Sequence, residues 1–272
     1  MKRGDLSPKT GAAAGYLLCF LLIPIYVNMF PIWKHLSSQF GEDIFIYLPL
    51  LFLVLFIGCT LGVWVKAGIK TAPINKVSLS LGILFCCLGL LTTDPEFPVK
   101  RVHVVEYAFL CLVARYAMSH FLQGLPLFFF SAFFCVLLGV HDEFLQGLHP
   151  ARTYGLRDMG VNLLGSFGGG LIWHSLHLFS KRQSSAIRIT DICFVCWLAV
   201  SVLMLVWPAQ YYRGLVLEMW ISLPLLVTGV YYYFYRNKFT TELSHGITSL
   251  ALTAVVLGIY PLATRMPGIV FY

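Results

Sequence analysis

Three short clusters of polar residues interrupt an otherwise apolar stretch between positions 100 and 170. In chain order they are His103, Glu106 and Tyr107; Asp142, Glu143 and Gln146; and Arg152, Asp158 and Asn162. Carboxylates and imidazoles serve proteins as general acids and bases, whereas guanidinium groups bind phosphates and carboxylates. Because ionisable groups at the ends of apolar spans are costly to hold there, we expect these clusters to carry a function.

The spacing within each cluster predicts that its side chains share one face of a helix. His103 lies three positions before Glu106 and four before Tyr107, and residues with that spacing are neighbours on a helix surface. The second and third clusters also contain pairs four residues apart. We therefore expect three helices whose polar ends meet at one side of a membrane and form a single site.

Acid–base chemistry on a lipid or lipid-linked head group is the leading hypothesis for this site. The predicted catalytic residues are His103, Glu106, Asp142, Glu143 and Asp158. The predicted substrate-binding residues are Tyr107, Gln146, Arg152 and Asn162. Arg152 is the expected anion clamp, and Asp142 or Glu143 is the expected base.

The same residues admit three other interpretations. Asp142, Glu143 and Asp158 offer oxygen ligands to Mg²⁺ or Ca²⁺, and His103 would extend the choice to Zn²⁺ or Mn²⁺, so a divalent cation is a candidate cofactor. A protein without enzymatic activity can use such clusters to bind or transport a lipid or a peptide terminus. The clusters can also form a structural ion network, in which Asp158 caps its helix.

The composition indicates a helical membrane protein. Of the 272 residues, 58% are hydrophobic and only 11% are charged, and the mean hydropathy is +0.80; a soluble domain has about 25% charged residues. Nucleic-acid binding is not expected, because the net charge of +7 is not gathered into a basic run. Apolar runs of about 20 residues predict an all-α, polytopic fold with nine transmembrane helices, at 12–30, 44–65, 77–93, 101–121, 125–147, 157–179, 190–207, 215–235 and 244–263.

The Lys and Arg residues predict an orientation in the cell membrane. Counted along nine alternating spans, they are more numerous on the side of the N-terminus, which places the N-terminus inside and the C-terminus outside. The positive charge on the outer side is concentrated at Lys100, Arg101, Arg152 and Arg157. This concentration favours an outer site that binds a phosphate or carboxylate. The first apolar run is expected to be a retained span, because no small-residue cleavage site follows it.

Small residues in the run 157–179 predict close helix packing. Gly165 and Gly169 form a G-x-x-x-G pattern, which lets two membrane helices approach closely. Together with the three polar clusters and Pro150, this pattern resembles the VanZ-like membrane proteins, a family named after a teicoplanin-resistance protein. The resemblance covers roughly residues 75–180, and the family's usual Gly before Arg152 is Ala151 here.

The resemblance implies a small bundle of membrane helices in the bacterial cell envelope, in a family associated with glycopeptide tolerance and antibiotic resistance. It implies a VanZ-like core at 76–182 and leaves N-terminal helices at 1–75 and C-terminal helices at 183–272 unexplained. The partner expected from the resemblance and the clusters together is a membrane lipid or a lipid-linked envelope precursor.

Overall fold

The computed structural model describes residues 7–41, 74–95, 97–150, 152–180 and 188–272, with isolated positions between 43 and 65. The span expected at 44–65 lies largely outside the described residues, as does Ala151. Within the described ranges the chain is all-helical, apart from one isolated bridge between Leu215 and Phe271. The α-helices are α1 (Pro8–Val27), α2 (Met29–Phe40), α4 (Lys76–Thr92), α5 (Val102–Ser119), α6 (Gly124–Gly147), α7 (Leu156–Ser175), α8 (Ile189–Ala209), α9 (Leu223–Tyr235), α10 (Ser244–Leu257) and α11 (Tyr260–Ala263). The short 3-10 helices are η1 (Pro98–Arg101), η2 (Gln210–Tyr212), η3 (Met219–Ser222), η4 (Arg236–Lys238) and η5 (Thr241–Leu243).

Five helical segments in the described part of the chain are long and apolar enough to cross a membrane. They are Pro8–Val27, Val102–Ser119, Gly124–Gly147, Ile189–Tyr212 and Thr241–Ala263. Each coincides with one of the nine spans expected from the sequence. α4 is apolar but shorter, α9 has 13 residues, and α7 carries polar residues and several glycines. The described residues therefore contain five candidate membrane spans, while the number nine stays a prediction.

Local sequence signals explain where α1 and α4 begin. The side chain of Ser7 accepts a hydrogen bond from the backbone N–H of Thr10, and Pro8 occupies the first position of α1. The side chain of Asn75 accepts from the backbone N–H of Ser78 at the start of α4. Both caps satisfy amide groups that a helix leaves without an internal partner.

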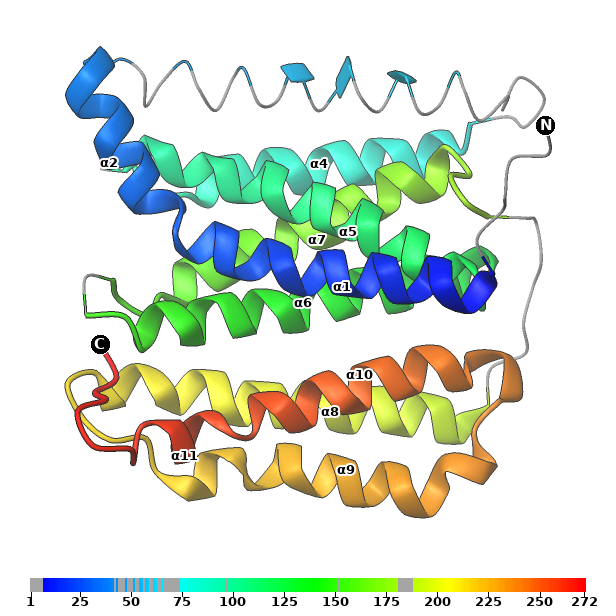
Figure 1. Ribbon diagram of the computed structural model, residues 1–272. Coiled ribbons are helices and arrows are strands. Elements are labelled where there is room, and N and C mark those ends of the chain that lie inside the picture. The colour runs from blue at the N-terminus through cyan, green and yellow to red at the C-terminus, as the bar shows by residue number, and fades with distance from the viewer. Residues whose placement is uncertain are drawn as a thin grey trace.

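Helix α7 packs against α4, α5 and α6 and lies at the centre of the group that these four helices form (Figure 1). A Cβ added to Gly169 would lie 2.5 Å from Ala108 Cα, and one added to Gly165 would lie 2.9 Å from the carbonyl oxygen of Val104. Only glycine allows α5 to approach α7 so closely. The predicted packing role of the G-x-x-x-G pattern is thereby confirmed.

The remaining helices complete the bundle around this group. α1 packs against α5 and α6, so a helix from the predicted N-terminal region belongs to the same packed unit as the predicted core. α8, α9 and α10 pack together, and α10 joins them to α6 (Figure 1). Large apolar side chains such as Leu91 of α4 and Leu203 of α8 stay exposed, as expected where helices face lipid.

Candidate functional site

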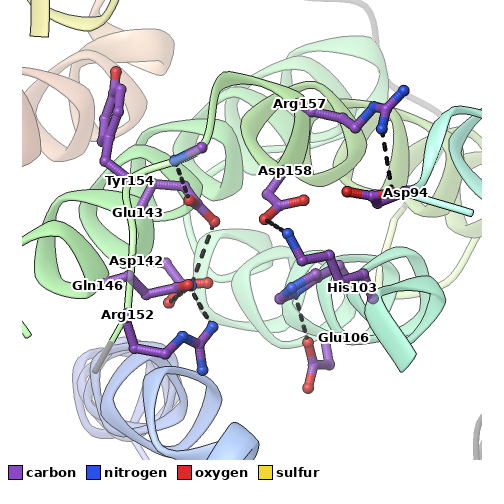
Figure 2. A network of polar contacts seen from close by, with 12 residues as sticks. Asp94, His103, Glu106, Asp142, Glu143, Gln146, Arg152, Tyr154, Arg157 and Asp158 are labelled. Atoms are coloured by element: carbon purple, nitrogen blue, oxygen red, sulfur yellow. Dashed lines mark hydrogen bonds and ion pairs between the residues drawn. The ribbon is translucent and has the colours of Figure 1, made fainter. Parts of the chain in front are cut away.

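The end of α6 and the beginnings of α5 and α7 lie at the same end of the bundle, where α1 also ends (Figure 1). The three polar clusters of the sequence are carried by these helix ends and by the link between α6 and α7. The expected meeting of the clusters at one end is therefore what the fold produces. Figure 2 shows labelled members of all three clusters, among them His103, Asp142 and Asp158, gathered between these helix ends.

The first turns of α5 present an imidazole and a carboxylate side by side. His103 Nδ1 lies 3.0 Å from Glu106 Oε2, an ion pair when the imidazole is protonated, and both side chains are buried. Glu106 Oε1 has no hydrogen-bond partner within the part of the chain that the structure describes. The hydroxyl of Tyr26 in α1 donates to the backbone carbonyl of Glu106 at 3.1 Å and fixes α1 against this turn.

The carboxylates of the second cluster are fully buried and hydrogen-bonded. Tyr107 donates its hydroxyl to Asp142 Oδ2 at 2.8 Å. The Gln146 amide donates to Asp142 Oδ1 at 3.1 Å and to Glu143 Oε1 at 3.3 Å, and the Gly155 N–H donates to Glu143 Oε2 at 3.1 Å. These contacts tie the end of α6 to α5 and to the start of α7.

The link between α6 and α7 is held from several sides. The guanidinium of Arg152 donates to Gln146 Oε1, and also to the backbone carbonyl of Val27 at 3.2 Å. Two residues later, the Tyr154 hydroxyl donates to the Val206 carbonyl at 2.6 Å, and Arg213 donates to the Tyr154 carbonyl. Burial raises the pKa of the Tyr154 phenol well above its ordinary value, so this phenol stays a donor at neutral pH.

The third cluster presents one paired carboxylate and one buried amide. Lys100 Nζ lies 2.8 Å from Asp158 Oδ2, whereas Asp158 Oδ1 has no hydrogen-bond partner among the described residues. Asn162 is fully buried one turn further along α7, and neither atom of its amide group has a hydrogen-bond partner in the described ranges. A buried polar group without a partner costs about 1–3 kcal/mol, so Asp158 Oδ1 retains the capacity to accept a hydrogen bond from a bound molecule.

A pocket of about 210 Å³ lies between these residues. It is lined by Tyr26, Met29, Trp33, Phe97, Lys100, Val102, His103, Glu106, Gln146, Arg152, Thr153 and Asp158. Five of the nine predicted site residues line this pocket: His103, Glu106, Gln146, Arg152 and Asp158. Tyr107, Asp142, Glu143 and Asn162 are not among the lining residues and are fully buried behind them.

Two of the predicted positive residues belong to a different surface. Arg101 and Arg157 line a second, open groove of about 670 Å³ between α4 and α7, together with Leu90, Leu91 and Leu164. Arg157 NH1 lies 3.6 Å from Asp94 Oδ1 there, and its side chain is 57% exposed. Of the four outer cations that the sequence singles out, only Lys100 and Arg152 therefore face the pocket.

Sequence reasoning missed the aromatic side of the pocket. Tyr26 comes from α1, Trp33 from α2 and Phe97 from the link before α5. Tyr26 lies near the end of the first predicted span and Trp33 follows that end, at the membrane level expected for the polar clusters. That shared level is the one signal in the sequence that points to them.

The residues proposed as cation ligands are not arranged to hold a metal. Among the described residues, no group of three or more His, Cys, Asp and Glu side chains is suitably placed for an ion. Asp142 and Glu143 accept hydrogen bonds from protein donors, and Asp158 is paired with Lys100. The interpretation of Asp142, Glu143 and Asp158 as the ligands of a cation therefore has no geometric basis.

Comparisons with protein-family models, with curated proteins and with solved structures find no match to this chain. The VanZ-like resemblance thus rests on the motif residues alone.

Proposed function

We propose that this protein spans the bacterial cell membrane several times and binds the head group of a lipid or lipid-linked envelope precursor. One observation carries the proposal: five ionisable side chains and an aromatic wall surround one compact pocket at the end of an apolar bundle. The five are Lys100, His103, Glu106, Arg152 and Asp158. Apolar pockets with a few convergent polar groups are the usual form of small-molecule sites.

The pocket suggests a revised division of roles among the predicted residues. Asp142 or Glu143 was the expected base, but both are fully buried, and each of their carboxylate oxygens accepts a hydrogen bond from the protein. They serve better as positioning residues, which hold Gln146 and the start of α7. His103, oriented by Glu106, becomes the candidate acid–base group because it lines the pocket and its imidazole can donate or accept a proton.

Arg152 remains the candidate anion clamp. It lines the pocket, and Gln146 and the Val27 carbonyl hold its guanidinium in place. A guanidinium fixed in this way offers directed donors to a phosphate or carboxylate. The excess of Lys and Arg on the N-terminal side supports an arrangement with nine spans, an inner N-terminus and an outer C-terminus, in which this pocket faces outward. The motif residues support membership of the VanZ-like family.

Native mass spectrometry of the gently extracted protein tests the proposal. We expect wild type to retain a lipid or lipid-linked molecule. The retained amount should be at least tenfold lower in Arg152→Ala, in line with the strength of charge-assisted hydrogen bonds. Arg157→Ala is the matched control, because this arginine lies in the neighbouring groove with an exposed side chain. Equal retention by all three proteins, each shown by its melting curve to be folded, would contradict the proposal.

Binding without turnover is the second candidate, favoured by the position of Asp142 and Glu143 behind the pocket wall. His103→Gln separates the two candidates. An enzyme should keep its bound molecule in this variant but lose the mass change that wild type produces during incubation with a membrane lipid extract. A pure binding protein should produce no mass change even as wild type.

A further inference from the structure

Charges of both signs line the pocket. Lys100 and Arg152 contribute two positive charges, Glu106 and Asp158 contribute two negative charges, and His103 beside Glu106 adds a positive charge when its imidazole is protonated. A bare anion bound among them would meet both carboxylates, and like charges about 4 Å apart repel by roughly 1 to 4 kcal/mol, depending on the local dielectric. A simple phosphate is therefore a poor match to the pocket as a whole.

Each carboxylate also has an oxygen in need of a donor. Glu106 Oε1 and Asp158 Oδ1 have no hydrogen-bond partner among the described residues, and both side chains are more than nine-tenths buried. Ionised carboxylates only accept hydrogen bonds, so a suitable ligand must bring N–H or O–H groups. A primary ammonium group brings three such donors together with the positive charge that these two residues attract.

The other side of the pocket favours the opposite charge. Arg152 extends from the link after α6 beside Gln146, whereas Glu106 lies on α5 (Figure 2). Gln146 and the Val27 carbonyl fix the guanidinium in this position. The pocket thus receives the Arg152 guanidinium from the link after α6 and the carboxylates of Glu106 and Asp158 from α5 and α7.

Size and aromatic content narrow the ligand further. About 210 Å³ is less than the volume of roughly 300 Å³ at which drug-sized ligand sites begin, so the pocket accepts a compact group rather than a sugar chain. Trp33 and Tyr26 line it, and aromatic faces attract cations. This wall adds to the attraction for an ammonium group.

We propose that the pocket recognises a compact zwitterion, whose primary ammonium group binds at Glu106 and Asp158 and whose phosphate or carboxylate binds at Arg152. This inference rests on the proposed function and specifies its ligand. Two sources share the chemistry: the phosphoethanolamine head group of a lipid and a free amino acid or dipeptide.

Binding of short-chain lipids to the purified full-length protein in detergent tests the inference. The probes are dihexanoyl phosphatidylethanolamine, its trimethylated counterpart phosphatidylcholine, and phosphatidic acid, which has the phosphate without the amine. We expect phosphatidylethanolamine to bind at least tenfold more tightly than either of the others. Competition by dialanine tests the second source. Displacement of the lipid by dialanine at equal or lower concentration would support an amino acid or dipeptide as the zwitterion.

Glu106→Gln is the diagnostic variant, because it keeps the size of the side chain and removes its charge. It should reduce the preference for phosphatidylethanolamine over phosphatidic acid about tenfold. Glu242→Gln is the matched control, since Glu242 is exposed in η5 and lies at the opposite end of the bundle (Figure 1). If Glu106→Gln does not fold, Asp158→Asn provides the same measurement.

The possible failures are distinguishable. If none of the four probes binds to the wild-type protein, the head-group function itself is wrong. If phosphatidic acid or phosphatidylcholine binds as tightly as phosphatidylethanolamine, the head-group function stands and the inference of a zwitterion with a primary ammonium group is wrong. An unchanged preference in folded Glu106→Gln and Asp158→Asn would also overturn the inference.

Discussion

Two buried aspartates occupy the same position in two helices and differ in what surrounds them. Asp158 is the third residue of α7, and Asp191 is the third residue of α8. Asp191 accepts hydrogen bonds from the Arg188 N–H at 2.8 Å, the Thr240 N–H at 3.1 Å and the Thr240 hydroxyl at 2.6 Å. Asp158 has one partner, Lys100, and one oxygen without a hydrogen-bond partner in the described part of the chain.

This difference separates a structural carboxylate from a candidate ligand-binding one. Asp191 satisfies the first turn of α8 and joins it to the segment before α10, and the protein itself supplies every bond. Asp158 faces a pocket and retains capacity to bind something else. The helix dipole favours an acid at both positions, so the local sequence alone does not distinguish them.

Removal of Asp191 should have the largest effect on stability. Asp191→Ala deletes three hydrogen bonds and leaves the buried N–H of Thr240 without its acceptor. We expect a loss of roughly 3 kcal/mol in the free energy of unfolding, measured by thermal unfolding in detergent. A variant that is as stable as wild type would show that Asp191 is not the structural member of the pair.

Disruption of the contact between α7 and α5 should have an intermediate effect on stability. Gly169→Ala places a Cβ 2.5 Å from Ala108 Cα, so the two backbones must separate. The expected cost is about 2 kcal/mol, measured by the same thermal unfolding. Gly160→Ala, in the same helix but with nothing near the added Cβ, is the matched control and should be neutral or slightly stabilising. If both variants melt alike, close approach of α5 does not position the start of α7.

Neutralisation of Asp158 should have the smallest effect on stability. Asp158→Asn keeps the shape of the side chain, and its partner Lys100 is one-third exposed and can be hydrated. We expect a change below about 1 kcal/mol, as for exposed ion pairs, together with a clear loss of phosphatidylethanolamine binding. Destabilisation comparable to that of Asp191→Ala would make Asp158 a structural residue as well.

The clusters themselves were predictable because helix spacing is local. His103 and Glu106 are three residues apart and in contact, and Gln146 reaches back to Asp142 four residues before it. Such pairs follow from 3.6 residues per turn once the segment is helical. The apolar runs that make these segments helical membrane candidates are likewise a property of composition.

The content of the pocket was not predictable in the same way, because it depends on how each helix is rotated and on residues far away in the sequence. Tyr26 reaches the site from α1 and Trp33 reaches it from α2. Arg157, in contrast, is turned toward Asp94 and the neighbouring groove. Asp142 and Glu143 satisfy the residue pattern of a base, yet tertiary packing buries them behind the wall. The sequence by itself determined the apolar helices and the polar clusters, since both arise from neighbouring residues. Only the tertiary structure decided which polar groups face the pocket, because packing between distant segments sets the rotation and depth of each helix.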